Sequence, residues 1–282
     1  MNAALHTLYS SDFYEIIDFK CLCTDCLKSK PEHSSVFCIS FVRKGNFLFN
    51  VFRKSLDSYN GCVLVTKPEY EHTVTHIHTI PDECTIIQFK PSFFETLKDR
   101  YKQTAFFSDN DQHSTLVKTS TDLEFLHYQI LQLISTGTGT KLRIDHLVME
   151  IIEKTLLIVT NYKPHPKIND RLKKNHLTTI ERAKEYITMN FTNDISLTEI
   201  AEYCYVSPFH FSRIFKVFTA YSPHQFLLNI RLKNAELLLK NTSKPIADIA
   251  WSSGFNSIEH FSYAFRHKYK FAPAKLRVGS LA

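Results

Sequence analysis

Two similar seven-residue segments carry the side chains best suited to chemistry in this sequence. Residues 210–216 read His-Phe-Ser-Arg-Ile-Phe-Lys and residues 260–266 read His-Phe-Ser-Tyr-Ala-Phe-Arg, with a serine three positions ahead of each copy. Arginine can bind guanine O6 and N7 bidentately in the major groove of DNA, and lysine can pair with a phosphate. The repeat therefore indicates two basic segments of common design that could contact nucleic acid.

The first copy has the spacing of an amphipathic helix. Its inner face is expected to consist of Phe211, Ile214, Phe215 and Phe218, which recur at helical intervals. A second set of residues has the same spacing but is displaced by two positions from the inner set. Two positions correspond to about 200° around the helix, so this second set should point outward. That set consists of Phe209, Ser212, Arg213 and Lys216. An ordinary solvated surface would explain one such face. The presence of the same pattern in a second segment favours DNA binding.

The second copy follows the same pattern with different outward chemistry. Its inner face is expected to consist of Phe261, Ala264 and Phe265, and its outward face of Glu259, Ser262, Tyr263 and Arg266. Tyr263 stands where the first copy has Arg213. Glu259 could accept a hydrogen bond from a cytosine amino group or repel phosphate. We therefore expect the second helix to discriminate less between bases than the first.

Short helices are expected to position both segments. Residues 197–203 and 246–252 have helical patterns that end just before each copy. The residues expected to begin helices are Ser196, which forms a capping box with Glu199, and the N-caps Ser207 and Ser257. Gly254 is expected to end the helix over residues 246–252. Helix, tight turn and helix occur twice, which is typical of a pair of helix-turn-helix units.

A longer amphipathic helix over residues 223–240 is expected to join the two units, with Arg231, Lys233 and Lys240 exposed. At 1.5 Å per residue, about 18 residues span about 27 Å. A rigid spacer of this length can hold two recognition helices near the separation of successive major grooves on one face of DNA, about 34 Å. One chain could therefore read two adjacent grooves.

The charge distribution points to the same region. Residues 174–282 hold 14 Lys/Arg against 8 Asp/Glu, whereas the remaining 20 Lys/Arg are balanced by 20 Asp/Glu. The net charge of +6 therefore lies entirely with the repeat. A local basic surface attracts polyanions such as DNA by releasing counterions from phosphates.

Composition narrows the class of protein. A chain of 282 residues with 44% hydrophobic content suits about two globular domains. No run approaches the length of about 20 apolar residues needed to cross a bilayer, and the first ten residues lack the order of a secretion signal. The seven cysteines form no evident disulfide framework. We therefore expect a cytoplasmic protein with reduced thiols and no membrane partner.

The pattern of the N-terminal part predicts short strands, and the pattern of the whole chain predicts the α+β fold class. The expected strands are residues 13–20, 36–42, 47–52, 61–66, 73–80 and 83–89. Six short strands at this spacing suggest a small sandwich or barrel. A helix is expected after Pro91, followed by a polar loop over residues 103–114 and helices over residues 122–135 and 142–160.

The helix over residues 142–160 carries an apolar stripe too wide for a helix that rests on one surface. The stripe consists of Ile144, Leu147, Val148, Ile151, Ile152, Thr155, Ile158 and Val159. It could be buried within its own domain, or one side could meet its counterpart in a second subunit, which would make the protein a homodimer.

Two prolines at positions 164 and 166 favour an extended linker after this helix. We therefore expect a sensory and dimerisation domain over residues 1–160, a linker over residues 161–173, and a helical domain over residues 174–282.

From about Thr178 to Arg277 the sequence resembles the DNA-binding domain of AraC-type bacterial transcriptional regulators. The matching motifs are Ser196-Leu-Thr-Glu-Ile-Ala201, Ser207-Pro-Phe-His-Phe-Ser-Arg-Ile-Phe-Lys216, Arg231-Leu-Lys-Asn-Ala-Glu-Leu-Leu-Leu239, Ile246-Ala-Asp-Ile-Ala250, Gly254-Phe255, Phe261-Ser-Tyr-Ala-Phe-Arg266 and Pro273-Ala-Lys-Leu-Arg277. The resemblance implies a transcription factor with double-stranded DNA, an effector and RNA polymerase as partners, and activation as its effect.

The same resemblance implies that the first recognition helix is the stronger base reader. It points to Phe209, His210, Ser212, Arg213 and Lys216. The family usually has glycine where this chain has Ala220-Tyr221 and Lys270. Because glycine tolerates positive φ, we expect local strain or a different turn at these positions.

Residues 61–72 resemble part of the cupin-type sensory domain found in many such regulators, which implies a small β-barrel. The resemblance rests on Gly61-Cys-Val-Leu-Val-Thr-Lys-Pro-Glu-Tyr-Glu-His72. The first metal-binding motif of cupins is not found ahead of Gly61. His76 and His78 should share one face of a strand, where they could line a ligand cavity or remain solvated.

Cys21, Cys23 and Cys26 are the candidates for a metal or redox site, with His33 or Cys38 as a fourth ligand. Buried, unreactive cysteines are the alternative that we favour. We therefore expect no metal, no cofactor and no catalytic residues. The alternative function is a metal-dependent cupin enzyme or a thiol-based repair protein fused to a DNA-binding domain.

Overall fold

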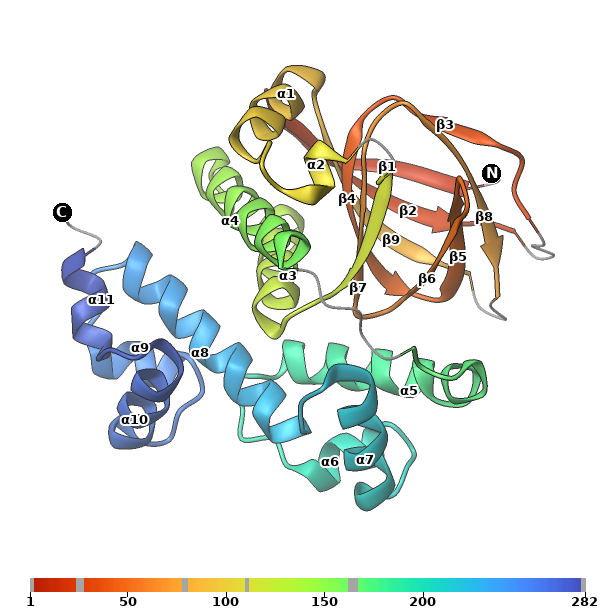
Figure 1. The fold of residues 1–282 in the computed structure, drawn as a ribbon. Coiled ribbons are helices and arrows are strands. Elements are labelled where there is room, and N and C mark those ends of the chain that lie inside the picture. Colours follow the sequence, from red (N-terminus) through yellow and green to blue (C-terminus); the bar gives the residue numbers. More distant parts are fainter. Residues whose placement is uncertain (1–2, 24–27, 78–80, 110–111, 162–166, 280–282) are drawn as a thin grey trace. The chain divides into compact units, whose positions relative to one another are not determined.

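The computed structural model describes residues 3–23, 28–77, 81–109, 112–161 and 167–279 (Figure 1). It divides into two compact units, Met1–Glu181 and Arg182–Ala282. The first unit is built of strands with helices beside them, and the second is helical, which confirms the predicted α+β class. Of the predicted linker, residues 162–166 lie outside the described residues.

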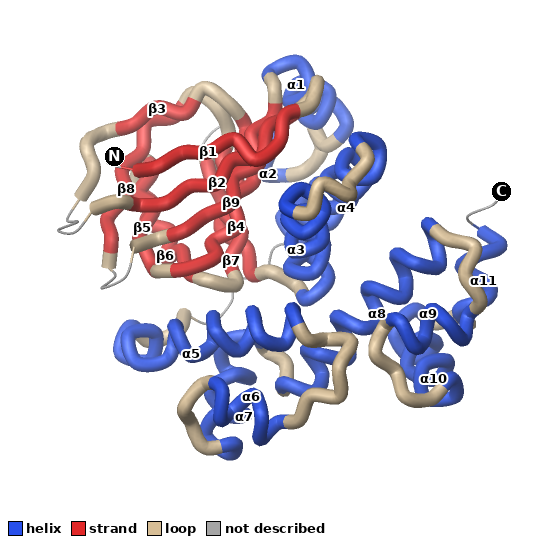
Figure 2. Tube along the Cα trace, turned by 180° about the vertical axis from the view of Figure 1, so that it is seen from behind, coloured by secondary structure: helices blue, strands red, loops and turns tan. Residues whose placement is uncertain are grey.

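The strands of the first unit form two antiparallel sheets (Figure 2). Their bounds are β1 Ala3–Ser10, β2 Tyr14–Cys21, β3 Glu32–Ser34, β4 Phe37–Lys44, β5 Asn46–Val51, β6 Lys54–Tyr59, β7 Cys62–Thr66, β8 Tyr70–His76, β9 Glu83–Phe89 and β10 Ser114–Lys118. The six-stranded sheet has the order β1-β2-β9-β4-β7-β10, and the four-stranded sheet has the order β3-β8-β5-β6.

The two sheets face each other across a shared apolar core, so the unit is a sandwich, which is one of the two arrangements that the strand spacing predicted, and not a closed barrel. The core consists of Val42, Phe47, Phe49, Val51, Leu64, Val74 and Cys84, which come from both sheets. The chain passes from β4 in one sheet to β5 in the other through Gly45, whose φ is +83°. Among the described residues, the edge strands β1 and β10 of one sheet do not pair with the edge strands β3 and β6 of the other, so the strand pairing does not continue around a barrel.

Four strands were not predicted from the sequence, because all four lie at the edges of the sheets. β1, β6 and β10 are edge strands, and β3 is short and also lies at an edge. An edge strand such as β6, Lys54–Tyr59, has one open side and tolerates polar residues, so its alternation is weak. The predicted polar loop over residues 103–114 instead contains α2, Ala105–Ser108, and the predicted strand over residues 73–80 ends at His76 within the described residues.

Four helices follow or interrupt the strands of the first unit. They are α1 Pro91–Arg100, α2, α3 Thr121–Ser135 and α4 Lys141–Thr160. The side-chain oxygens of Ser120 and Thr140 accept from backbone N–H groups in the first turns of α3 and α4, which fixes where these helices begin.

Helix α4 buries its predicted stripe inside the first unit except for Ile158, which is half-buried. Helices α2 and α3 and strand β10 pack against it. A different row remains exposed and consists of Leu142, Met149 and Leu157.

The helices of the second unit match the two predicted helix-turn-helix units. They are α5 Asp170–Met189, which begins in the first unit, α6 Leu197–Tyr203, α7 Pro208–Thr219, α8 Pro223–Asn241, α9 Ile246–Ser252, α10 Ile258–Tyr269 and α11 Pro273–Gly279. Ser196 and Glu199 form the predicted capping box, and Ser257 accepts from the His260 N–H. Ser207 occupies the N-cap position of α7, but its side chain makes no capping hydrogen bond.

The prediction that Lys233 is exposed was wrong. Its side chain is fully buried in α8 and donates to the Glu236 carboxylate at 2.8 Å. A lysine in a helical pattern indicates an exposed position, but its charge can be buried when it is paired. Among the described residues, we find no helix with the length and apolar character needed to span a membrane.

Candidate nucleic-acid interface

Helix α7 presents the outward face that its spacing predicted. Its inner residues, Phe211, Ile214, Phe215 and Phe218, are all buried. Arg213 and Lys216 are exposed, Ser212 is half-buried, and Phe209 is 80% exposed near the start of the helix. His210 is also exposed. A large aromatic ring left in solvent beside two cations is the surface expected of a helix that binds a groove.

Helix α10 repeats this arrangement. Phe261, Ala264 and Phe265 are buried, whereas Glu259, Tyr263 and Arg266 are exposed and Ser262 is half-buried. Tyr263 is 74% exposed, so it presents an aromatic ring on the outward face, as Phe209 does in α7. The two helices therefore share a common inner face and differ in outward chemistry.

Aromatic packing holds α7 against α8, and helix α5 contacts the neighbouring helix α6. The ring of Phe215 contacts Phe211 of α7 and Phe226 of α8, each at a centroid distance of 5.4 Å. Arg182 of α5 donates to the backbone carbonyl of Tyr203, at the end of α6, at 3.0 Å. A helix fixed on its inner side can hold its outward side chains in one geometry.

Both recognition helices end in the left-handed conformation. Ala220 follows α7 with φ +66°, and Lys270 follows α10 with φ +69°. These are the two positions where the sequence lacks the expected glycine. Because a Cβ atom makes this region unfavourable, both turns carry local strain.

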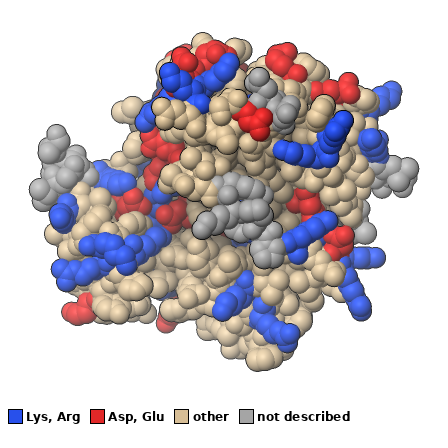
Figure 3. Space-filling view, viewed as in Figure 1, with Lys and Arg blue, Asp and Glu red and all other residues tan. Residues whose placement is uncertain are grey.

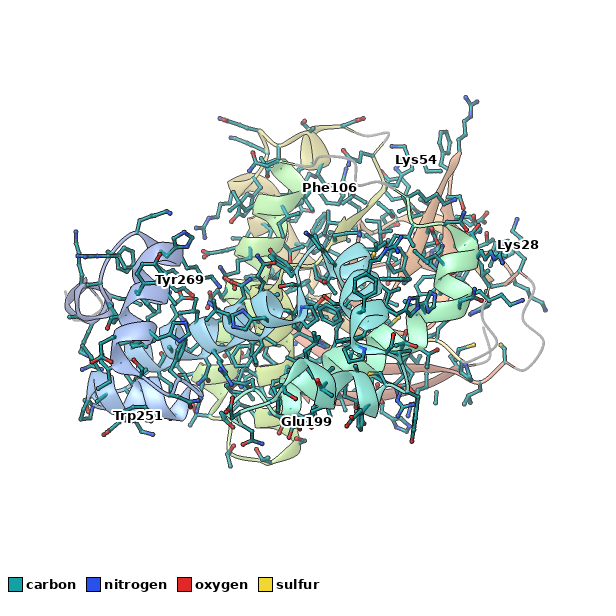
Figure 4. All side chains as sticks on the ribbon, turned by 90° about the horizontal axis from the view of Figure 1, so that it is seen from below. Lys28, Lys54, Phe106, Glu199, Trp251 and Tyr269 are labelled. Carbon is teal, nitrogen blue, oxygen red and sulfur yellow. The ribbon has the colours of Figure 1, made fainter. Side chains whose placement is uncertain are left out.

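A buried charge cluster connects α8 and α10, and the sequence analysis did not predict it. Glu236 accepts from Lys233 at 2.8 Å, from Lys240 at 2.6 Å and from the Tyr269 hydroxyl at 3.1 Å. Burial alone would raise the pKa of Glu236, but the two ammonium groups outweigh it and hold the pKa at about 2. The cluster joins α8 to α10, whose Tyr269 is labelled in Figure 4.

Gly254 and Arg231 fix the approach of α9 to the first helix-turn-helix unit. A Cβ atom at Gly254 would lie 2.6 Å from the Phe191 carbonyl oxygen and 2.9 Å from Arg231 Nε. Arg231 donates to the carbonyls of Phe191 and Asn193 at 2.8 and 2.7 Å. The predicted stop residue is therefore also a position where only glycine fits.

Two further aromatic side chains lie exposed beside the recognition helices. Tyr205 is 84% exposed in the turn before α7, and the guanidinium of Arg182 lies 5.2 Å from its ring. Trp251 is 49% exposed and labelled in Figure 4. Neither was singled out from the sequence, because each lies outside the repeated segment. Figure 3 shows Lys and Arg side chains on the drawn face of the region that holds the helices of the second unit.

The first unit contains a cavity of about 510 Å³ between its sheets. Its walls are apolar at Phe47 and Phe49 and polar at His72, His76 and Asp82. His76 Nδ1 lies 2.5 Å from the Asp82 carboxylate, and both side chains are nearly inaccessible to solvent. Burial lowers the pKa of His72, which stacks on Phe49 at 4.6 Å. His78 lies outside the described residues.

The cysteine candidates do not come together within the described residues. Cys21 is buried and Cys23 is half-buried, while Cys26 lies outside the described residues. No three His, Cys, Asp or Glu side chains in the described part of the chain are placed to hold a metal ion. Burial raises the pKa of the Cys38 thiol, which lines the cavity, to about 11, so this thiol is protonated at neutral pH.

Known proteins resemble this chain most clearly in its helical part. A family model described as a helix-turn-helix domain matches residues 180–278. The HTH-type transcriptional regulator ArgR of Pseudomonas aeruginosa is 31% identical over 151 residues, which cover 52% of this chain and 44% of ArgR. The bifunctional transcriptional activator/DNA repair enzyme AdaA of Bacillus subtilis is 32% identical over 98 residues, which cover 35% of this chain and 46% of AdaA.

A solved structure matches over a greater length. ToxT of Vibrio cholerae, determined with a bound unsaturated fatty acid, is 13% identical with a TM-score of 0.42, and the match covers 95% of both chains. The chain spans less than half the length of the curated relatives named above.

Proposed function

We propose that the protein is a sequence-specific regulator of transcription, with an AraC-type DNA-binding domain in the region that matches the helix-turn-helix family model, residues 180–278. Helices α7 and α10 insert into successive major grooves of double-stranded DNA. Helix α8, with 19 residues, is about 28 Å long and joins the two units. The observation that carries the proposal is the repeated outward face on two helices with the same inner packing.

The residue roles follow from the chemistry of each outward face. Arg213 reads a guanine edge, Lys216 pairs with phosphate, and Phe209 packs on a thymine methyl group. The proposed DNA-contacting residues are Phe209, His210, Ser212, Arg213, Lys216, Glu259, Ser262, Tyr263 and Arg266. Because Tyr263 replaces the more selective arginine, α10 contributes less discrimination.

The first unit provides an effector site. Its cavity is large enough for a small molecule and combines apolar walls with a few polar groups, which is typical of ligand pockets. We therefore assign the cavity to ligand sensing.

Helix α4 is the proposed dimer contact, through its exposed row Leu142, Met149 and Leu157. Activation of transcription, with RNA polymerase as the partner, is proposed from the family resemblance alone.

The test is the affinity of the full chain for duplexes selected from random DNA. Arg213→Ala should weaken binding to the selected duplex by about 1–3 kcal/mol and relax the preference at one base pair. The control is Lys174→Ala, which removes an exposed cation of α5 outside the recognition helices. Unchanged affinity in Arg213→Ala, or failure of the wild type to select any sequence, would overturn the proposal.

A further inference from the structure

One arginine and two tyrosines form a cluster at the turn between α6 and α7, within the second unit. The guanidinium of Arg182 lies 5.1 Å from the ring of Tyr203 and 5.2 Å from the ring of Tyr205. Attraction between a cation and aromatic rings favours this arrangement. The Tyr203 ring is itself held by Tyr186 of α5, at a centroid distance of 4.5 Å. The cluster therefore fixes a positive charge directly before the first recognition helix.

The charge of Arg182 is not paired with a carboxylate in the described part of the chain. The contacts of its guanidinium there are the Tyr203 carbonyl, at 3.0 Å, and the two tyrosine rings. Because an arginine has five N–H donors, this geometry leaves donors for a further acceptor. The Glu199 carboxylate, labelled in Figure 4, instead accepts from the Tyr186 hydroxyl and the Ser196 N–H. An anionic ligand can therefore supply the counter-charge of Arg182.

Tyr205 occupies a backbone position that favours glycine. Its φ is +58°, in the left-handed region, where a Cβ atom is unfavourable. The equivalent position in the second helix-turn-helix unit is Gly254, with φ +83°. The two positions are equivalent because each N–H donates to the carbonyl three residues earlier, at 3.0 Å. The turn alone therefore does not require tyrosine, and the unfavourable conformation points to a function of the side chain.

The Tyr205 side chain is 84% exposed and lies two positions ahead of Ser207, the N-cap of α7. The Ser207 side chain makes no capping hydrogen bond to the first turn of α7. In helix-turn-helix proteins the N-terminal residues of the recognition helix contact the bases, while the preceding helix crosses the DNA backbone. A phosphate that borders the groove entered by α7 is therefore within the expected reach of the cluster.

We propose that Arg182 and Tyr205 form a binding site for one phosphate of the DNA backbone, with Tyr203 as a positioning residue. The proposal rests on the proposed function, because this phosphate belongs to the DNA that α7 reads. The guanidinium supplies the charge, the Tyr205 hydroxyl donates a hydrogen bond, and the Tyr203 ring orients the guanidinium. Because a phosphate contact carries no sequence information, the site strengthens binding to all sequences and fixes the register of α7.

The test is the affinity of the full chain for a duplex selected from random DNA and for an unrelated duplex, measured over a range of salt concentrations. Arg182→Gln removes the charge and retains a donor for the Tyr203 carbonyl. Binding to both duplexes should weaken about tenfold, because a hydrogen bond to a charged group is lost. The slope of log affinity against log salt should fall in magnitude by about 1, because one phosphate contact fewer releases counterions.

A second variant separates the phosphate contact from the packing of the cluster. Tyr205→Phe keeps the ring beside Arg182 and removes only the hydroxyl. It should weaken binding to both duplexes about tenfold and leave the melting temperature unchanged. The matched control is Arg100→Gln in the first unit, because the guanidinium of Arg100 also lies beside a tyrosine ring, 5.7 Å from that of Tyr101. This control should leave the affinity and the salt slope unchanged.

The proposal fails if Arg182→Gln keeps the wild-type salt slope, or if Tyr205→Phe binds as the wild type does. It also fails if Arg182→Gln alters the preference between the two duplexes, which is the effect expected of Arg213→Ala. Should Arg182→Gln not fold, Tyr205→Phe decides alone. A wild type that selects no sequence overturns the proposed function and this site with it, whereas a selective wild type with an unaltered slope in Arg182→Gln overturns the phosphate site only.

Discussion

At the scale of single residues, Glu236 shows how a charge buried in the second unit contributes stability. The carboxylate is 7% exposed and is held by Lys233, Lys240 and the Tyr269 hydroxyl. Lys233 is fully buried, so without Glu236 its ammonium would lie in a low dielectric without a counter-charge. The cluster contacts α10 through the Tyr269 hydroxyl, and it leaves the outward face of that helix accessible.

We expect Glu236→Gln to destabilise the second unit by about 3 kcal/mol at pH 7. The pKa of Glu236 is depressed to about 2 in the folded chain, below its ordinary value of 4.5. Its contribution is therefore present above about pH 4.5 and is lost as pH falls toward 2. Urea unfolding followed by the fluorescence of Trp251, the single tryptophan, measures this difference across pH.

The control for this prediction is Glu185→Gln, which replaces an exposed carboxylate of α5. It should change the free energy of unfolding by less than about 0.5 kcal/mol. A wild-type advantage over Glu236→Gln that stays constant from pH 7 to pH 3 would contradict the proposed role of the ion cluster.

At the scale of elements, the helices were predictable where local sequence dictates them. The inner faces of α7 and α10 follow from spacing, and the starts of α6 and α10 follow from their caps. Edge strand β6 and the burial of Lys233 were not predictable, because each departs from the simple rule of polar residues outside. Strand β6 pairs on one side only and tolerates polar residues, and Lys233 is buried with its charge paired to Glu236 of the same helix. The cavity was not derivable either, since its walls come from two sheets whose arrangement spacing does not specify.

The exposed row on α4 carries a prediction at this scale. Leu157→Glu should convert a dimer to a monomer, because it places a charge in the proposed apolar contact. Sedimentation velocity of the full chain measures the mass. The matched control is Leu5→Glu on β1, because Leu5 and Leu157 are both 62% exposed. A monomeric wild type, or a dimer unaffected by Leu157→Glu, would refute this contact.

At the scale of the whole molecule, the chain combines a sandwich with a cavity between its sheets and a helical unit that presents two recognition helices. Helix α5 contributes to both units. The excess positive charge lies in residues 174–282, so attraction to DNA is concentrated in the helical part. Binding of DNA should therefore weaken steeply as salt rises, while selectivity depends on the outward faces of α7 and α10.

A hydroxyl-radical footprint on a duplex selected from random DNA tests the central claim most directly. For each bound chain, the account predicts two protected tracts about one helical turn, or about 34 Å, apart. Arg213→Ala should weaken protection in one tract more than in the other. A single short tract for each chain, or uniform protection without sequence preference, would contradict the insertion of two recognition helices into successive grooves.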